Sequence, residues 1–208
     1  MNKIIIVDDH PVFRSGLKQI LNEAYDMEVV GEAGNARELY QLLDNVKWDV
    51  VVLDIVLPGE SGLDILKELK YRFKKVSALC MSYHPESQFG IRTLKAGAAG
   101  YITKEAAPEE IVNAIRRIVS GRRYISPSLA ERLAENLDIQ SEKPDHHKLS
   151  DREFQIMGMI GAGKTITEIA SELLLSVQTV STYRSRILQK MHMKTNAEIT
   201  RYVVENRL

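Results

Sequence analysis

Polar side chains follow four short apolar runs in the first half of the chain, at the point where each run ends. Short apolar runs that alternate with helical patterns are typical of parallel strands. Ligands of an open α/β sheet bind beyond the carboxyl ends of its strands. The pattern therefore predicts that these polar side chains converge in one crevice. They are Asp8 and Asp9 after 4–7, Asp54 after 50–53, Ser82 after 78–81, and Lys104 after 101–103.

The predicted crevice holds three carboxylates, a hydroxyl and an ammonium. Carboxylates that lie close together repel one another unless a cation neutralises them, and oxygen ligands of this kind suit Mg²⁺. The residue types therefore predict a Mg²⁺ site for phosphoryl chemistry.

The elements that position these residues form repeated strand–helix units over residues 1–125. The pattern predicts strands at about 3–7, 28–33, 49–53, 77–81 and 100–103, and helices at about 12–23, 35–44, 62–72, 87–96 and 108–120. Five such units predict an α/β fold: a flavodoxin-like, doubly wound parallel five-stranded sheet of order 2-1-3-4-5.

Residues 126–147 are predicted to be a linker with a short helix at about 128–137, and a polar stretch follows it. The adjacent His146 and His147 fall there, and a solvated linker is favoured over a metal site because no third positioned ligand is near. Residues 148–208 are helical in pattern, with capping boxes at Ser150 and Thr195. The sequence thus predicts a second, small all-α domain.

Two helices of that domain, at about 166–173 and 177–191, predict a helix-turn-helix. The net charge of the chain is zero, which argues against nucleic acid, but no acidic residue lies between Glu172 and Glu198. The first half of such a second helix meets base edges, and its basic residues suit phosphates. A merely solvated helix face stays open as the alternative. The expected DNA contacts are Gln178, Thr179, Ser181, Thr182, Arg184, Ser185, Arg186 and Lys190.

Residues 158–165 match the P-loop pattern GxxxxGK[ST]. A P-loop joins a strand to a helix within a parallel sheet, whereas the residues before this match have helical spacing. We therefore reject nucleotide binding here and expect Gly161 and Gly163 to end one helix and allow the turn into the next.

The single cysteine, Cys80, falls in a predicted buried strand, so no disulfide framework is expected. No signal peptide or membrane-spanning run is recognisable, which predicts a cytoplasmic protein without membrane contact.

Four segments of the chain resemble response regulators of the NarL/FixJ family, which carry a receiver domain and a LuxR-type helix-turn-helix. The segments follow the order of that family and span nearly the whole chain except the linker. They are 7–17, 52–59 with Gly62, 96–104, and 149–153 together with 169–170 and 176–190.

The resemblance implies a role for each residue of the crevice. Asp54 would be the phosphoacceptor, and Lys104 would pair with the phosphoryl group. Asp9, Asp54 and the backbone carbonyl of Val56 would bind Mg²⁺, with Asp8 acting through water. Ser82 and Tyr101 would form a switch pair that responds to the phosphoryl group.

The resemblance also implies partners: a sensor histidine kinase as phosphoryl donor and double-stranded promoter DNA as target. RNA polymerase is a further candidate partner. A homodimer is expected on phosphorylation, with the last helix, 196–206, as its contact.

Three positions depart from the family pattern. Tyr83 stands where many receivers carry a small residue, and it is expected to crowd the attacking water and slow dephosphorylation. Glu105 stands where many receivers outside this family carry a proline. Thr167 replaces a frequent basic phosphate contact, which reduces the DNA affinity expected from that helix.

Two other classes of function stay open on the sequence alone. A phosphatase or phosphotransferase could use Asp54 as a covalent nucleophile, but such enzymes usually carry an acid two residues later, where this chain has Val56. A helical domain that binds protein instead of DNA is the other alternative, and the basic, hydroxyl-rich face of the 177–191 helix argues against it.

Overall fold

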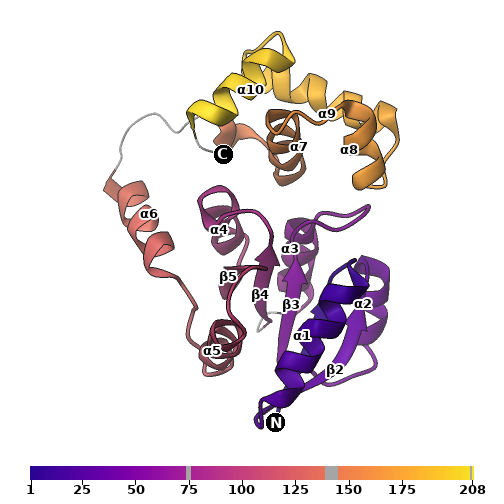
Figure 1. Ribbon diagram of the computed structural model, residues 1–208, viewed down its shortest axis with the longest axis vertical. Helices are drawn as coiled ribbons and strands as arrows, with labels where there is room; N and C mark the ends of the chain where they lie inside the picture. Colours follow the sequence, from indigo (N-terminus) through magenta and orange to yellow (C-terminus); the bar gives the residue numbers. More distant parts are fainter. Residues whose placement is uncertain (74–75, 139–144, 207) are drawn as a thin grey trace. The chain divides into compact units, whose positions relative to one another are not determined.

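A computed structural model describes residues 1–73, 76–138, 145–206 and 208 of the chain (Figure 1). Contacts divide it into two compact units, Met1–Leu133 and Ala134–Leu208. The polar stretch predicted within the linker lies mostly at 139–144, outside the described residues.

The first unit is built on a parallel sheet of five strands in the order β2-β1-β3-β4-β5. The predicted doubly wound topology is confirmed. The central strands β3 and β4 and most of β1 are buried on both faces, so their sequences are mostly continuous apolar runs, whereas the edge strand β2 carries Glu28 and Glu32. They are β1 (Asn2–Val7), β2 (Met27–Ala33), β3 (Val50–Asp54), β4 (Ser77–Ser82) and β5 (Gly100–Thr103).

Helices alternate with these strands along the chain. One face of the sheet packs against the first and fifth helices through Leu17, Leu21, Ile111, Ile115 and Ile118, all of them buried. The helices are α1 (Pro11–Glu23), α2 (Ala36–Leu43), α3 (Gly62–Arg72), α4 (Glu86–Lys95) and α5 (Pro108–Val119). The strands and helices predicted from the sequence agree with these bounds within a few residues.

All secondary-structure elements among the described residues of the second unit are helices. Its predicted helices are confirmed, and the capping box at Ser150 and Glu153 is complete. A further capping box, between Thr165 and Glu168, was not predicted. The box predicted at Thr195 is only half formed, because Thr195 accepts from the Glu198 N–H but the Glu198 carboxylate accepts from the Lys194 N–H. After α6 (Pro127–Asp138), whose residues to 133 belong to the first unit, the elements are η1 (Asp145–Lys148), α7 (Asp151–Gly161), α8 (Ile166–Glu172), α9 (Val177–Lys190) and α10 (Asn196–Glu205).

The P-loop match at 158–165 falls on the end of helix α7 and the turn after it. It does not follow a strand, as a P-loop would. Residues up to Gly161 belong to α7, and Gly163 adopts a φ of 86° in the turn that leads to α8. Gly161 has a second role: a Cβ there would lie 2.5 Å from the Val203 side chain, so glycine lets α10 approach α7 closely.

The prediction that His146 is a solvated linker residue is wrong. Its Nδ1 lies 2.9 Å from the hydroxyl of Tyr202 in α10, and its ring packs against Phe154 of α7. The residues Asp145–Lys148 form a short 3₁₀ helix that closes the start of the helical unit. Sequence periodicity could not show this, because the contact joins residues that are far apart in the chain.

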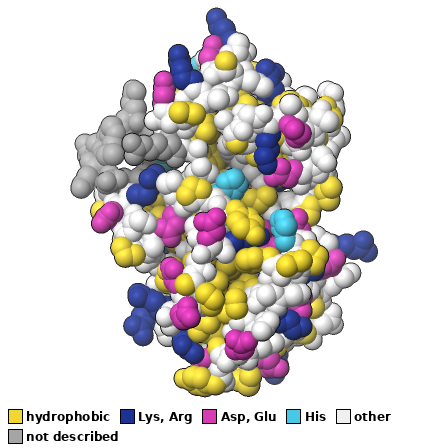
Figure 2. Space-filling view, viewed as in Figure 1, with side chains coloured by type: hydrophobic (Ala, Val, Ile, Leu, Met, Phe, Trp, Pro, Cys, Tyr) yellow, Lys and Arg dark blue, Asp and Glu magenta, His cyan; other side chains and the backbone are white. Residues whose placement is uncertain are grey.

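Charged side chains of both signs are interspersed over the face shown in Figure 2, in keeping with the net charge of zero. None of the helices in the described part of the chain is long and apolar enough to cross a membrane.

Gly62, at the start of α3, packs directly on the end of β3. A Cβ added there would lie 2.2 Å from the carbonyl oxygen of Asp54 and 2.5 Å from the Cα of Ile55. We predict that Gly62→Ala lowers the free energy of unfolding by about 1–3 kcal/mol or more, because backbone on both sides must move. Denaturant unfolding measures this. Gly16→Ala in α1 is the control, since nothing lies within 4 Å there, and an equal loss in both variants would contradict the packing argument.

Candidate functional site

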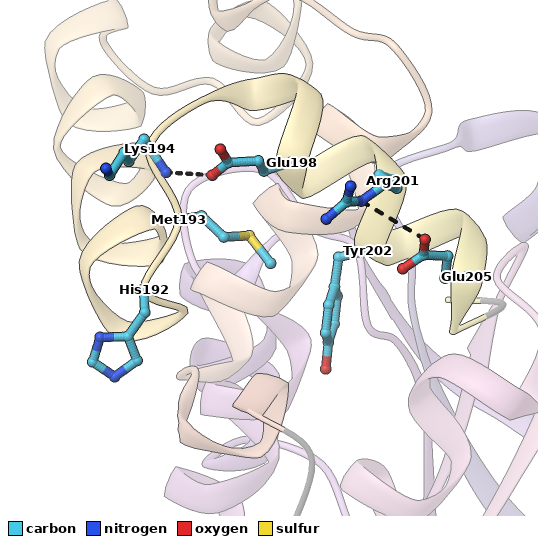
Figure 3. Close-up of a pocket in the computed structure, with 7 residues that line it drawn as sticks. All are labelled: His192, Met193, Lys194, Glu198, Arg201, Tyr202 and Glu205. Atoms are coloured by element: carbon cyan, nitrogen blue, oxygen red, sulfur yellow. Dashed lines mark hydrogen bonds and ion pairs between the residues drawn. The ribbon is translucent and has the colours of Figure 1, made fainter.

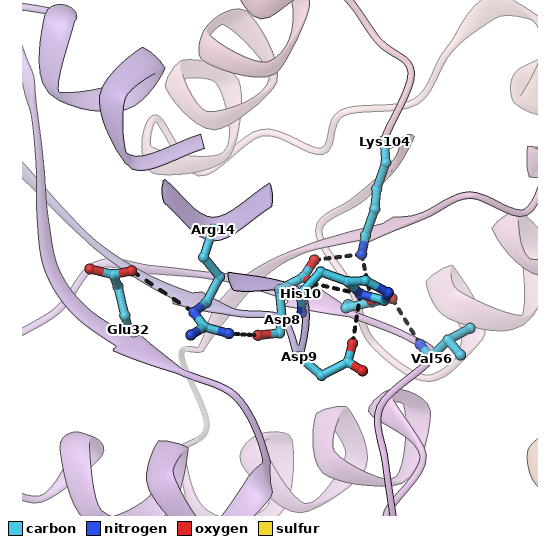
Figure 4. Close-up of polar contacts among 8 residues, drawn as sticks. Asp8, Asp9, His10, Arg14, Glu32, Val56 and Lys104 are labelled. Atoms are coloured by element: carbon cyan, nitrogen blue, oxygen red, sulfur yellow. Dashed lines mark hydrogen bonds and ion pairs between the residues drawn. The ribbon is translucent and has the colours of Figure 1, made fainter. Parts of the chain in front are cut away.

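Three buried charged side chains meet at the carboxyl edge of the sheet, and two of them, Asp8 and Lys104, are labelled in Figure 4. The Nζ of Lys104 lies 2.5 Å from Asp8 Oδ2 and 2.6 Å from Asp54 Oδ2. The side chains of all three are at most 3% exposed. The structure thus brings together the three residues that the sequence placed at three strand ends.

Strand register explains why these side chains meet. β3 lies between β1 and β4, with Val7 paired to Leu53 and Ser82 paired to Thr103 across the sheet. Asp8, Asp54 and Lys104 directly follow Val7, Leu53 and Thr103, and Ser82 is the last residue of its strand. The backbone N–H of Lys104 donates to the Ser82 carbonyl at 2.8 Å, which fixes the loop after β5 against β4.

The surroundings of Asp54 set its electrostatics. Burial raises the pKa of Asp54 to about 6; Lys104 opposes this shift, and the Asp8 carboxylate adds to it. The Oδ1 atom of Asp54 accepts a hydrogen bond of 2.9 Å from the Val56 N–H. Burial also works against the charged form of Lys104, but Asp54 and Asp8 outweigh it and raise the pKa of the ammonium. The cluster therefore keeps a cation fixed beside a nucleophilic oxygen.

A group of oxygen and nitrogen atoms beside Lys104 could hold a metal ion. Asp8, Asp9, His10 and Asp54 each offer one ligand atom, and these atoms lie within 4.8 Å of one another. Asp9 Oδ1 is buried and receives no hydrogen bond from the described residues, although His10 Nδ1 lies 2.9 Å away. Three carboxylates beside one ammonium leave an excess of negative charge. The donor set therefore fits a hard divalent cation such as Mg²⁺.

The sequence analysis did not assign a role to His10, although its place directly after two aspartates was visible. It also missed Arg14, whose guanidinium donates to the Asp8 carbonyl at 2.5 Å and lies 3.9 Å from Glu32. Both contacts hold the loop after β1 in place (Figure 4).

Two aromatic rings flank the ammonium of Lys104. Its Nζ lies 4.7 Å from the ring centre of Phe13 and 5.0 Å from that of Tyr83, distances at which a cation attracts the ring face. The rings of Phe13 and Tyr83 also meet edge-on at 6.4 Å. Tyr83 therefore lies over the site, as its position after Ser82 suggested, and Phe13 was not anticipated.

The predicted switch residues are both buried. The Tyr101 hydroxyl donates to the His84 carbonyl at 2.6 Å, and the His84 N–H donates to Ser82 Oγ at 3.2 Å. Both residues therefore contact the loop between β4 and α4, which joins the end of a central strand to the start of a helix.

In the second unit, α9 follows α8 after a tight turn in which Leu174 adopts a φ of 49°. Its apolar side is buried through Val180 and Ile187, and Met191 directly after the helix is buried as well. The opposite face carries the expected DNA contacts. Gln178, Thr182, Ser185 and Arg186 are exposed, and Thr179, Ser181 and Arg184 are half-buried.

Hydroxyl groups on this face donate to their own helix. Thr182 donates to the Gln178 carbonyl at 2.9 Å and Ser185 to the Ser181 carbonyl at 3.0 Å. In this arrangement the oxygen atoms present lone pairs outward, which suit amino groups of bases as partners.

Two of the basic residues expected to contact DNA, Lys190 and Arg184, bind side chains of the helical unit itself. The Lys190 ammonium lies 2.6 Å from Glu153 Oε2, and Glu153 is buried at 3% side-chain exposure. Burial alone would raise the pKa of Glu153, but Lys190 and Ser150 outweigh it and hold that pKa below its usual value. Arg184 donates to the Asn196 side chain at 2.5 Å. The geometry therefore gives Lys190 a structural partner that the sequence did not reveal.

A pocket of about 320 Å³ lies at the turn between α9 and α10 (Figure 3). Glu198 accepts from the Lys194 backbone N–H, and Arg201 pairs with Glu205 along α10. Several polar groups of this pocket therefore already interact with one another. The residues that line the pocket do not include any of the expected DNA contacts on α9.

The fold and the buried cluster define a class: a receiver domain joined to a helix-turn-helix DNA-binding domain. Two family models match accordingly. The response regulator receiver domain matches residues 4–116, and the luxR family of bacterial regulatory proteins matches residues 147–203.

Relatives match over the whole length. Response regulator UvrY of Escherichia coli (strain K12) is 36% identical over 100% of this chain and 96% of its own length. Response regulator GacA of Pseudomonas aeruginosa is 36% identical over 99% and 97%, and oxygen regulatory protein NreC of Staphylococcus carnosus is 34% identical over 99% and 98%. The chain belongs to the NarL/FixJ family of two-component response regulators.

Solved structures show the same architecture. A LuxR-family response regulator from Aurantimonas sp. SI85-9A1 is 36% identical over 65% of this chain and 96% of its own, with a TM-score of 0.60. RcsB from Salmonella enterica serovar Typhimurium, solved on promoter rprA with BeF₃⁻, shares the fold at 24% identity, with coverages of 98% and 99% and a TM-score of 0.67.

Lys190 and Arg186 were both expected to contact DNA, but Lys190 forms an ion pair with the buried Glu153. We predict that Lys190→Met lowers the free energy of unfolding by about 1–3 kcal/mol, because it leaves the buried Glu153 carboxylate without its cation. Arg186→Ala should leave stability unchanged, weaken binding to all DNA sequences and reduce the salt slope by about 1. Thermal unfolding and salt-dependent fluorescence anisotropy measure the two effects. A Lys190→Met variant with unchanged stability and weaker DNA binding would contradict this assignment.

Proposed function

We propose that Asp54 accepts a phosphoryl group from a sensor histidine kinase in a Mg²⁺-dependent step, and that phosphorylation controls dimerisation and sequence-specific binding to promoter DNA. The observation that carries this proposal is the buried Asp54 carboxylate, held by Lys104 at one oxygen and by the Val56 N–H at the other. This arrangement orients a nucleophile and places a cation where new negative charge develops.

In the proposed step, an Asp54 oxygen attacks the phosphorus of a phosphorylated histidine on the kinase. The phosphorus–nitrogen bond breaks, and its electron pair returns to the histidine ring. The Lys104 ammonium then donates to a phosphoryl oxygen in place of a carboxylate oxygen. Mg²⁺, held by Asp9, Asp54 and the Val56 carbonyl with Asp8 acting through water, would neutralise charge on the transferred group.

Phosphorylation adds about −1.5 to −2 charge and three acceptor oxygens. Ser82, now an acceptor for the His84 N–H, would turn its hydroxyl to donate to one of them. Tyr101 is tied to the same loop through the His84 carbonyl. The loop before α4 would therefore shift when Asp54 is phosphorylated, and Ser82 and Tyr101 would act as the switch pair.

The second unit would read DNA through α9. Its outward hydroxyl oxygens and Gln178 would meet base edges, and Arg186 would meet phosphates. Few of the basic side chains on α9 are available for phosphates, since Lys190 and Arg184 are engaged within the unit. A single copy would therefore bind weakly, and a dimer formed through α10 would double the contacts. The chain would act in the cytoplasm on promoter DNA and, through it, on RNA polymerase.

The alternative of a turnover enzyme receives little support from the site. Position 56, two residues after the nucleophile, is a valine that contributes its backbone N–H to Asp54. A carboxylic acid at this position would be needed to protonate a leaving group.

The proposed function predicts a gain in DNA affinity on phosphorylation. Duplexes selected from a random pool by the acetyl-phosphate-treated chain serve as the ligand in fluorescence anisotropy at fixed salt. Treatment with acetyl phosphate and Mg²⁺ should tighten binding by roughly tenfold or more, which corresponds to about 1.4 kcal/mol of coupling. Asp54→Asn should show no gain. Equal affinity of the treated and untreated chain for every selected duplex would contradict phosphorylation control.

A further inference from the structure

Residues that follow α5 run along the outer edge of the sheet before α6 begins. The Tyr124 N–H donates to the Ala99 carbonyl at 2.9 Å, and Tyr124 forms an isolated parallel bridge with Gly100 of β5. β5 is an edge strand of the sheet. Tyr124 therefore attaches the chain to the edge of the sheet just before residues 126–133. We call residues 126–133 the strap.

The strap is anchored on α4 by an apolar contact. Leu129 is fully buried, and the position it faces on α4 is Gly90. A Cβ added at Gly90 would lie 2.7 Å from Leu129 Cδ1, and the three nearest atoms all belong to Leu129. Glycine at this helical position therefore makes room for the strap, at the usual cost of a glycine inside a helix.

Polar contacts fix the strap to the first turn of α4. Glu86 Oε2 accepts hydrogen bonds from Ser126 Oγ at 2.5 Å and from Ser128 Oγ at 2.7 Å. The Arg132 guanidinium donates to the Ser87 carbonyl at 3.1 Å. One buried leucine and three hydrogen bonds thus hold a segment that the sequence had assigned to a linker.

The same turn of α4 is tied to the phosphorylation site from its other end. His84, two residues before Glu86, accepts from Tyr101 and donates to Ser82. The strap and the switch residues therefore hold opposite ends of the short segment from Ser82 to Ser87. A shift of that segment toward Asp54 must alter the distances between Glu86, Ser87 and the strap.

We propose that α4 carries a docking surface, formed by Glu86, Ser87 and Gly90, whose occupant is the strap of the same chain, and that its occupancy is negatively coupled to phosphorylation of Asp54. This inference rests on the proposed function of Asp54. The docked strap holds the first turn of α4 in its unphosphorylated position, and phosphorylation releases it. Because coupling between two sites is reciprocal, loss of the strap favours the phosphorylated state. Release frees the connection to the helical unit, so the strap relays the state of the receiver.

Hydrogen exchange of the full chain, read by mass spectrometry, tests this coupling. The untreated protein should show protected amides in the strap. Acetyl phosphate with Mg²⁺ should make them exchange roughly tenfold faster, since a released helix end exchanges from an open state. Intact mass on the same sample reports the phosphoryl adduct.

Matched variants separate the strap from the rest of the receiver. Gly90→Leu places a side chain in the space of Leu129 and should release the strap without phosphorylation. Gly16→Leu in α1, where nothing lies within 4 Å of an added Cβ, is the control. Leu129→Ala removes the anchor and leaves the sheet core untouched. Both strap variants should exchange quickly at 126–133 and form the adduct several-fold faster than wild type.

The outcomes are distinguishable. An adduct on wild type with unchanged exchange in the strap would overturn the coupling and leave the proposed function intact. Fast exchange at 126–133 in the untreated wild type would overturn the docking itself. Absence of the adduct from wild type would remove the proposed function, and the coupling with it.

Discussion

The buried contact of Lys104 with Asp8 and Asp54 is the interaction on which the receiver depends. Two carboxylates with almost no solvent exposure could not remain charged at the edge of an apolar sheet without a cation between them. Their partner comes from the loop after β5, so the contact draws together the ends of β1, β3 and β5. The same geometry suits the proposed chemistry, because an ammonium that holds Asp54 would also be placed to hold an oxygen of a phosphoryl group on that residue.

A second buried ion pair organises the helical unit. Glu153 completes the cap of α7 through Ser150 and receives Lys190 from the end of α9. The pair fixes the recognition helix to the helix beneath it. It also engages a cation that was expected to contact phosphates, so the remaining exposed polar groups of α9 are mostly uncharged. A helix of this composition discriminates weakly alone, and its use in a transcription regulator fits an assembly in which two copies act together.

Much of the fold could be predicted from the sequence because most of its strands are buried and so appear as continuous apolar runs. Asp8, Asp54 and Lys104 could be predicted as a cluster because each stands at a strand end, and parallel strands end on one edge. The pairing of Lys190 with Glu153, the Phe13 ring beside Lys104 and the contact of His146 with Tyr202 could not. Each joins residues from different elements, and periodicity within one element carries no information about such contacts. Leu129 was expected in a helix, but the sequence did not show that it packs against Gly90 of α4. Only the structure shows that a larger residue at position 90 would collide with Leu129.

The central claim is that Asp54 is a Mg²⁺-dependent phosphoacceptor, and intact mass after incubation with acetyl phosphate measures it directly. Wild type and Asp54→Asn are compared with and without Mg²⁺. We expect a single phosphoryl adduct on the wild type in the presence of Mg²⁺, little without the ion, and none on Asp54→Asn. An adduct of equal yield on Asp54→Asn, or no adduct on a wild-type protein shown to bind Mg²⁺, would contradict it.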